Sequence, residues 1–115
     1  MANPSKQLSF FVDHLYRKYA PLGALHGLQL DLDLTRPNRP VENYRTLEEA
    51  LEAYLSFSTD TPHAGHLLIQ DSPTHLIIKD DKMVLNAEQK QKFTSDTISV
   101  KSRVGFGTTL MIALQ

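Results

Sequence analysis

The sequence predicts an α+β fold, a two-layer sandwich in which helices cover one face of a mixed β-sheet. Two observations lead to this prediction. Segments with an apolar residue at every third or fourth position, typical of amphipathic helices, occur with segments that alternate with period two, typical of half-buried strands. In the second half of the chain the expected strands follow one another through short turns, so we expect hairpins there.

The composition fits one globular domain over residues 1–115, because 41% of the residues are hydrophobic and 22% are charged. The formal net charge is −1 and no basic stripe occurs. The sequence therefore lacks the positive charge pattern that is typical of proteins that bind nucleic acid or membrane surfaces. The absence of cysteine excludes disulfides and thiol chemistry. No apolar run is long enough to span a bilayer and the N-terminus lacks a signal-peptide core, so we expect a cytoplasmic protein.

The first helix is predicted by apolar residues at spacings of three and four. We expect Asn3 to cap this helix and Pro21 and Gly23 to end it. Its apolar face consists of Leu8, Phe11, Leu15, Tyr19 and Leu22.

Alternating leucines from Leu28 to Leu34 predict the first strand, with the leucines toward the core. The stretch "TRPNRP" that follows contains two prolines and an asparagine, which indicate a turn or an exposed edge. "RTLEEALEAYLSFST" predicts the second helix, in which Thr46 and Glu49 have the spacing of a capping box. Its buried face should contain Leu47, Ala50, Leu51, Tyr54 and Leu55.

The remaining elements are short. "HLLIQDSPTHLIIKDD" predicts a hairpin that turns at Asp71–Pro73, and "NAEQKQKF" predicts a short helix capped by Asn86. "TISVKS" alternates again and "TTLMIALQ" is rich in strand formers. Because no helix follows the glycines of Gly105–Gly107, we interpret them as a hairpin turn and not as a phosphate-binding loop.

In this order the segments resemble the catalytic ATP-binding domain of sensor histidine kinases, the Bergerat-type fold of the GHKL superfamily. The resemblance covers nearly the whole chain. The opening helix and strand, the second helix and the central hairpin correspond in sequence order, and "DTISVKSRVGFGTTLMIALQ" is the most specific match. The resemblance implies a two-layer α/β sandwich and, in active members, a site for ATP and magnesium.

Most residues that would bind the nucleotide are replaced. The family's second helix carries two asparagines four residues apart, of which the first binds the magnesium ion, and Ala50 and Tyr54 occupy those positions here. The first glycine box corresponds to "DDKMV", where Asp80 matches the aspartate that bonds adenine but Lys82 and Val84 replace both glycines. The family's lid, second glycine box and long helix are missing, because "NAEQKQKF" leads through "TSD" directly into the next strand.

We therefore expect a non-catalytic pseudo-ATPase domain, without cofactor, that acts as a protein-interaction or regulatory module in two-component-type signalling. Its partner would be another protein or other domains of a signalling protein, and not nucleic acid or a membrane. The alternative is a residual ATP-binding catalytic domain that works with magnesium through Asp80, the only surviving match to the nucleotide site.

Two further hypotheses stay open. His63 and His66, with Asp71 and His75 nearby in sequence, are candidate ligands for the metal ion of a metal-dependent enzyme. Histidines in loops are, however, usually polar residues without a metal-binding role. Phe106, between two glycines of the closing turn, either folds over the sheet or is exposed as a contact for a partner.

Overall fold

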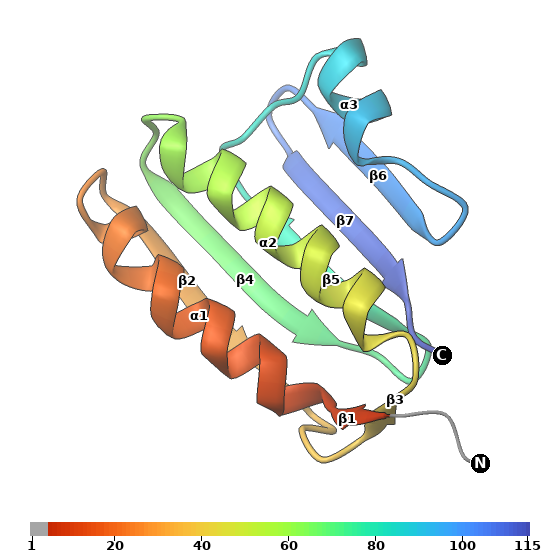
Figure 1. The fold of residues 1–115 in the computed structure, drawn as a ribbon. Helices are drawn as coiled ribbons and strands as arrows, with labels where there is room; N and C mark the ends of the chain where they lie inside the picture. Colours follow the sequence, from red (N-terminus) through yellow and green to blue (C-terminus); the bar gives the residue numbers. More distant parts are fainter. Residues whose placement is uncertain (1–4) are drawn as a thin grey trace.

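The computed structural model describes residues 5–115 as a five-stranded mixed sheet with helices on one face, which confirms the predicted fold class (Figure 1). The strands of this sheet are β2 (Leu28–Asp33), β4 (Gly65–Asp71), β5 (His75–Asp80), β6 (Ile98–Arg103) and β7 (Gly107–Ala113). They are arranged in the order β2–β4–β5–β7–β6. β2 and β4 are parallel, and the other neighbouring pairs are antiparallel.

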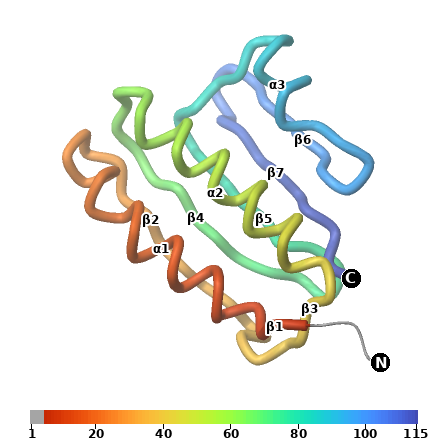
Figure 2. Tube along the Cα trace, viewed as in Figure 1, coloured from red at the N-terminus to blue at the C-terminus, as the bar shows by residue number. Residues whose placement is uncertain are grey.

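The helices are α1 (Leu8–Ala24), α2 (Tyr44–Asp60) and the short α3 (Ala87–Phe93). α1 and α2 lie side by side over the sheet, while α3 lies toward the β6 edge (Figure 2). A small second sheet, which the sequence did not predict, pairs β1 (Lys6–Gln7) with β3 (Pro40–Val41). No helix within residues 5–115 combines the length and the apolar character needed to cross a membrane.

The ends of α1 differ from the prediction. The helix begins at Leu8, and the predicted cap Asn3 lies outside the described residues. The predicted end is wrong, because Pro21 lies inside the helix, which continues to Ala24. Gly23 instead allows close packing: a Cβ atom there would lie 2.9 Å from the carbonyl oxygen of Leu28 on β2.

The predicted capping box of α2 is also wrong, because the helix begins before Thr46 and Asn43 occupies the N-cap position without a side-chain cap bond. The Asn43 side chain instead donates to the carbonyl oxygen of Ala113 at 2.9 Å and accepts from the backbone N–H of Gln115 at 2.9 Å. It therefore fixes the end of β7 to the start of α2. The cap of α3 is confirmed, since Asn86 accepts from the N–H of Gln89.

The core lies between the helices and the sheet. Alternation along the strands directs one set of side chains to this core and the other set to the opposite face, which α1 and α2 leave uncovered (Figure 1). Fully buried core residues include Leu47, Leu51, Leu55, Leu67, Ile69, Leu76 and Ile78. The same alternation places Asp80, the last residue of β5, on the core side beneath α2.

Candidate functional site

Asp80 is the centre of a buried polar cluster. The residue is 1% exposed, although a carboxylate is costly to remove from water unless donors surround it. The Oδ2 atom accepts hydrogen bonds from the Tyr54 hydroxyl at 2.8 Å and from the Ser58 hydroxyl at 2.7 Å. Tyr54 and Ser58 are four residues apart on α2 and therefore lie on one helix face, directed at the end of β5.

The ring of Tyr54 fills the space between α2 and the sheet. It is fully buried and meets the Phe93 ring edge-on, with centroids 5.4 Å apart. Phe57 contacts both rings, at centroid distances of 6.2 Å to Tyr54 and 5.4 Å to Phe93. Burial raises the pKa of the Tyr54 phenol, and the negative charge of Asp80 raises it further, so Tyr54 donates as a neutral hydroxyl.

His63 closes the remaining side of the cluster. Its Nδ1 atom lies 2.7 Å from the carbonyl oxygen of Thr61, and its Nε2 atom lies 3.3 Å from Oδ1 of Asp80. Because a carbonyl oxygen only accepts, Nδ1 carries the hydrogen in the contact with Thr61, and Nε2 is the ring nitrogen that faces Asp80. Both oxygens of Asp80 are thus engaged by the protein itself.

The segment that corresponds to the glycine box is held by a second set of bonds. The Thr108 hydroxyl donates to the carbonyl oxygen of Met83 at 2.7 Å and lies 2.8 Å from the Ser102 hydroxyl. The backbone N–H of Leu85 donates to Ser102 at 2.8 Å. Met83 is buried, whereas Val84 is 42% exposed.

Gly107 allows β7 to pass this segment. Its φ of +83° is a left-handed conformation, and a Cβ atom there would lie 2.6 Å from the carbonyl carbon of Asp81. Gly105, with φ of +88°, lies in the turn between β6 and β7, as the sequence predicted. The two glycines therefore serve a hairpin and a close backbone contact.

The histidines considered as metal ligands have different surroundings. His63 belongs to the Asp80 cluster, whereas Nδ1 of His66 lies 3.6 Å from Asp81 Oδ2 on the exposed side. His75 pairs with Ala113, at the opposite end of β5 from Asp80. Within residues 5–115 no group of three or more histidine, aspartate or glutamate side chains is placed to hold a metal ion.

Asp71 and Phe106 lie elsewhere. Asp71 accepts from the backbone N–H groups of Thr35 at 2.6 Å and of Arg36 at 3.0 Å and so fixes the loop after β2. Phe106 is 81% exposed at the tip of the β6–β7 hairpin.

The sequence pattern did not predict that Ser58 and His63 contact Asp80. A signal existed for Ser58, because it lies four positions after Tyr54 and therefore on the same helix face. His63 follows the helix in a loop, and its contact with Asp80 depends on tertiary packing.

The fold is similar to that of histidine kinase catalytic domains of known structure. The catalytic domain of histidine kinase ThkA aligns with 99% of this chain and 95% of its own at a TM-score of 0.73 and 13% identity. Acinetobacter baumannii histidine kinase AdeS aligns over 97% of this chain and 67% of its own, at a TM-score of 0.72 and 19% identity.

Two further structures add to this likeness. The histidine kinase domain of the E. coli osmosensor EnvZ aligns over 99% of this chain and 89% of its own, with a TM-score of 0.66 and 10% identity. Histidine kinase ThkA in complex with the response regulator protein TrrA aligns over 96% of this chain and 41% of its own, with a TM-score of 0.68 and 12% identity. No protein-family model and no curated protein matches the sequence. The chain therefore has the fold of a histidine kinase catalytic domain.

Proposed function

We propose that this domain of histidine kinase catalytic fold is a non-catalytic pseudo-ATPase, which acts as a protein-interaction or regulatory module in two-component-type signalling. The observation that carries the proposal is the state of Asp80. In the family that the sequence resembles, the matching aspartate offers a free acceptor to adenine. Here Asp80 is 1% exposed and is bonded by Tyr54, Ser58 and His63.

Admission of adenine would require the Tyr54 ring to leave its place. Exposing a buried aromatic ring costs roughly 2 kcal/mol of hydrophobic free energy, which alone weakens binding by about 30-fold. Moving the ring also breaks the bond of its hydroxyl to the buried carboxylate, and hydrogen bonds to charged groups contribute roughly 1.5–3 kcal/mol. Together these costs argue against a nucleotide at Asp80.

Magnesium has no evident ligand at the asparagine-box positions either. The side chain of Ala50 has no atom that can bind a metal ion, and the hydroxyl of Tyr54 donates a 2.8 Å hydrogen bond to Asp80. The neighbouring Glu52 is directed to the helix surface, where it accepts from Lys18 at 2.9 Å and from Tyr19 at 3.2 Å. The donor set therefore does not fit an ATP–magnesium complex.

The link between β5 and β6 supports the same conclusion. Residues 81–97 join the two strands and contain only the short α3 helix. Phe93, at the end of α3, packs on Tyr54 and helps to fill the space between α2 and the sheet. No segment of this link adds a glycine-rich loop with a helix N-terminus that could bind phosphates.

The signalling context is part of the proposal. It is supported by the likeness to histidine kinase catalytic domains and by the solved complex of ThkA with a response regulator. In this role the domain would bind another protein or other domains of a signalling protein, and would work without a cofactor.

Isothermal titration calorimetry with ATP and magnesium tests the proposal. We expect no saturable heat of binding at millimolar nucleotide. A thermal melt with the same nucleotide should show no rise in melting temperature. Asp80→Asn, which keeps the shape of the side chain, is the control variant. Micromolar binding by the wild type that is lost in Asp80→Asn would support the residual ATP-binding domain and refute the pseudo-ATPase.

A further inference from the structure

We propose that the free edge of β6 is a docking site for an extended acidic segment of a partner protein, which adds to the sheet beside β6. The inference rests on the proposed interaction role and names the surface that carries it. Strand addition is a common mode of peptide recognition, in which backbone bonds give affinity and alternate side chains give specificity.

The backbone of β6 offers unpaired groups along this edge. β6 is the last strand of the sheet, so only β7 pairs with it. The carbonyl oxygen of Thr97 accepts from the N–H of Ala113, and bonds alternate along an antiparallel pair. The backbone groups of Val100 and Ser102 therefore point away from β7, and in the described part of the chain no other segment bonds them. Such an edge is a template for another strand.

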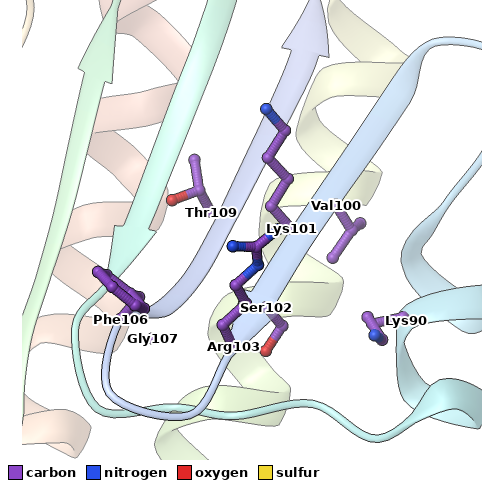
Figure 3. Close-up of a pocket in the computed structure, with 8 residues that line it drawn as sticks. All are labelled: Lys90, Val100, Lys101, Ser102, Arg103, Phe106, Gly107 and Thr109. Carbon is purple, nitrogen blue, oxygen red and sulfur yellow. The ribbon is translucent and has the colours of Figure 1, made fainter.

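Three cations line a hollow that includes the end of β6. A hollow of about 530 Å³ crosses β6 and is lined by Lys90, Lys101 and Arg103 but by no carboxylate (Figure 3). None of these cations forms an ion pair with another side chain of residues 5–115. In Figure 3 Lys101 and Arg103 extend from β6, while Lys90 approaches from α3. Because the whole chain has a net charge of −1, this positive charge is a local feature that favours an acidic ligand.

The hairpin tip beside the hollow is apolar. Phe106 is 81% exposed and Val104 is 85% exposed, and Phe106 also lines the hollow. An exposed aromatic ring next to cations is typical of the residues that anchor an interface. A partner segment would cover this ring at one end of the added strand.

The two faces of β6 define the chemistry of the partner strand. On the uncovered face, Lys101 and Arg103 would stand beside alternate residues of the added strand, so these residues should be acidic. On the helix side, the neighbours Ile98 and Val100 are half-buried and apolar, so the intervening residues should be apolar. The expected partner is therefore a segment in which acidic and apolar residues alternate.

Fluorescence anisotropy with a labelled peptide of alternating aspartate and valine tests the charge requirement. We expect saturable binding to the wild type and at least tenfold weaker binding to the Lys101→Glu/Arg103→Glu double variant. Lys79→Glu is the control, because Lys79 lies on the same exposed sheet face, on β5, but does not line the hollow. It should change the affinity by less than threefold. No binding to the wild type, or equal binding to the double variant, would overturn the proposal.

A second arm tests strand addition and leaves the protein unchanged. The same peptide with every backbone amide methylated keeps its charge but cannot donate hydrogen bonds along either edge, and we expect its binding to be lost. Equal affinity of the methylated peptide would refute strand addition. Val100→Pro removes an edge N–H without removing a bond to β7. If circular dichroism shows that this variant is folded, it should also lose binding.

A third arm identifies the occupant by sedimentation of the unliganded chain. We expect a monomer, whereas association abolished by Lys101→Glu/Arg103→Glu would assign the edge to a second copy and refute the partner-protein proposal. These failures leave the pseudo-ATPase proposal intact, because only the ATP titration decides that proposal.

Discussion

Replacing Tyr54 by phenylalanine removes one hydroxyl from the buried cluster and leaves the aromatic ring in place. The packing on Phe57 and Phe93 should therefore persist, and the effect should come from the lost 2.8 Å bond to Asp80. A hydrogen bond to a charged group contributes roughly 1.5–3 kcal/mol, and Asp80 keeps two other partners. We expect the free energy of unfolding to fall by about 2 kcal/mol.

Chemical denaturation with urea measures this change, and a thermal melt should show a decrease of about 8 °C for a domain of this size. Tyr19→Phe is the matched control, because its hydroxyl lies 3.2 Å from Glu52, whose side chain is 42% exposed. Solvent screening should limit the loss in that control to about 0.5 kcal/mol. An equal loss in both variants would refute the assignment of Tyr54 as a principal donor to a buried carboxylate.

Two further predictions concern the backbone near the site and the loop after β2. Gly107→Ala should lower the free energy of unfolding by more than about 3 kcal/mol, because the added Cβ would press on the Asp81 backbone. Gly105→Ala has a similar φ but nothing within 4 Å of the added Cβ, so it should lower this free energy by only about 1 kcal/mol. Similar losses for both variants in a urea titration would contradict the close contact at Gly107. Burial alone would raise the pKa of Asp71. Hydrogen bonds from the backbone N–H and the hydroxyl of Thr35 and from the backbone N–H of Arg36 outweigh this effect and lower the pKa below 3.8. The stabilisation is therefore present above the unfolded value of 3.8 and is lost as the pH falls through the lower folded value. Asp71→Asn should lower stability by about 1 kcal/mol at pH 7, and the gap to the wild type should close at lower pH; a gap that does not depend on pH would contradict this.

Strand patterns in the sequence predicted much of the sheet. The alternating leucines of β2 and the turn signals before β5 and β7 are local features, and each appears where it was expected. Helix ends were harder to predict, because packing decided them. Pro21 stays within α1, and Thr46 lies inside α2 because Asn43 ties the helix start to β7.

The site shows the same division. The sequence identified Asp80 and the replacement of the asparagine box by Ala50 and Tyr54. It could not show that Tyr54 itself binds Asp80, because that 2.8 Å contact joins an α2 residue to the end of a strand 26 positions later. Which residue fills the space between α2 and the sheet depends on how α2 packs on β5, and the sequence pattern does not specify that packing.

The space around Asp80 should be closed to nucleotide. The most direct measurement is an amide NMR titration of ¹⁵N-labelled protein with ATP and magnesium, observed at Tyr54, Asp80 and Thr108. We expect these amides to keep their chemical shifts up to millimolar nucleotide. Saturable shifts that centre on Asp80 and extend along α2 would contradict this expectation.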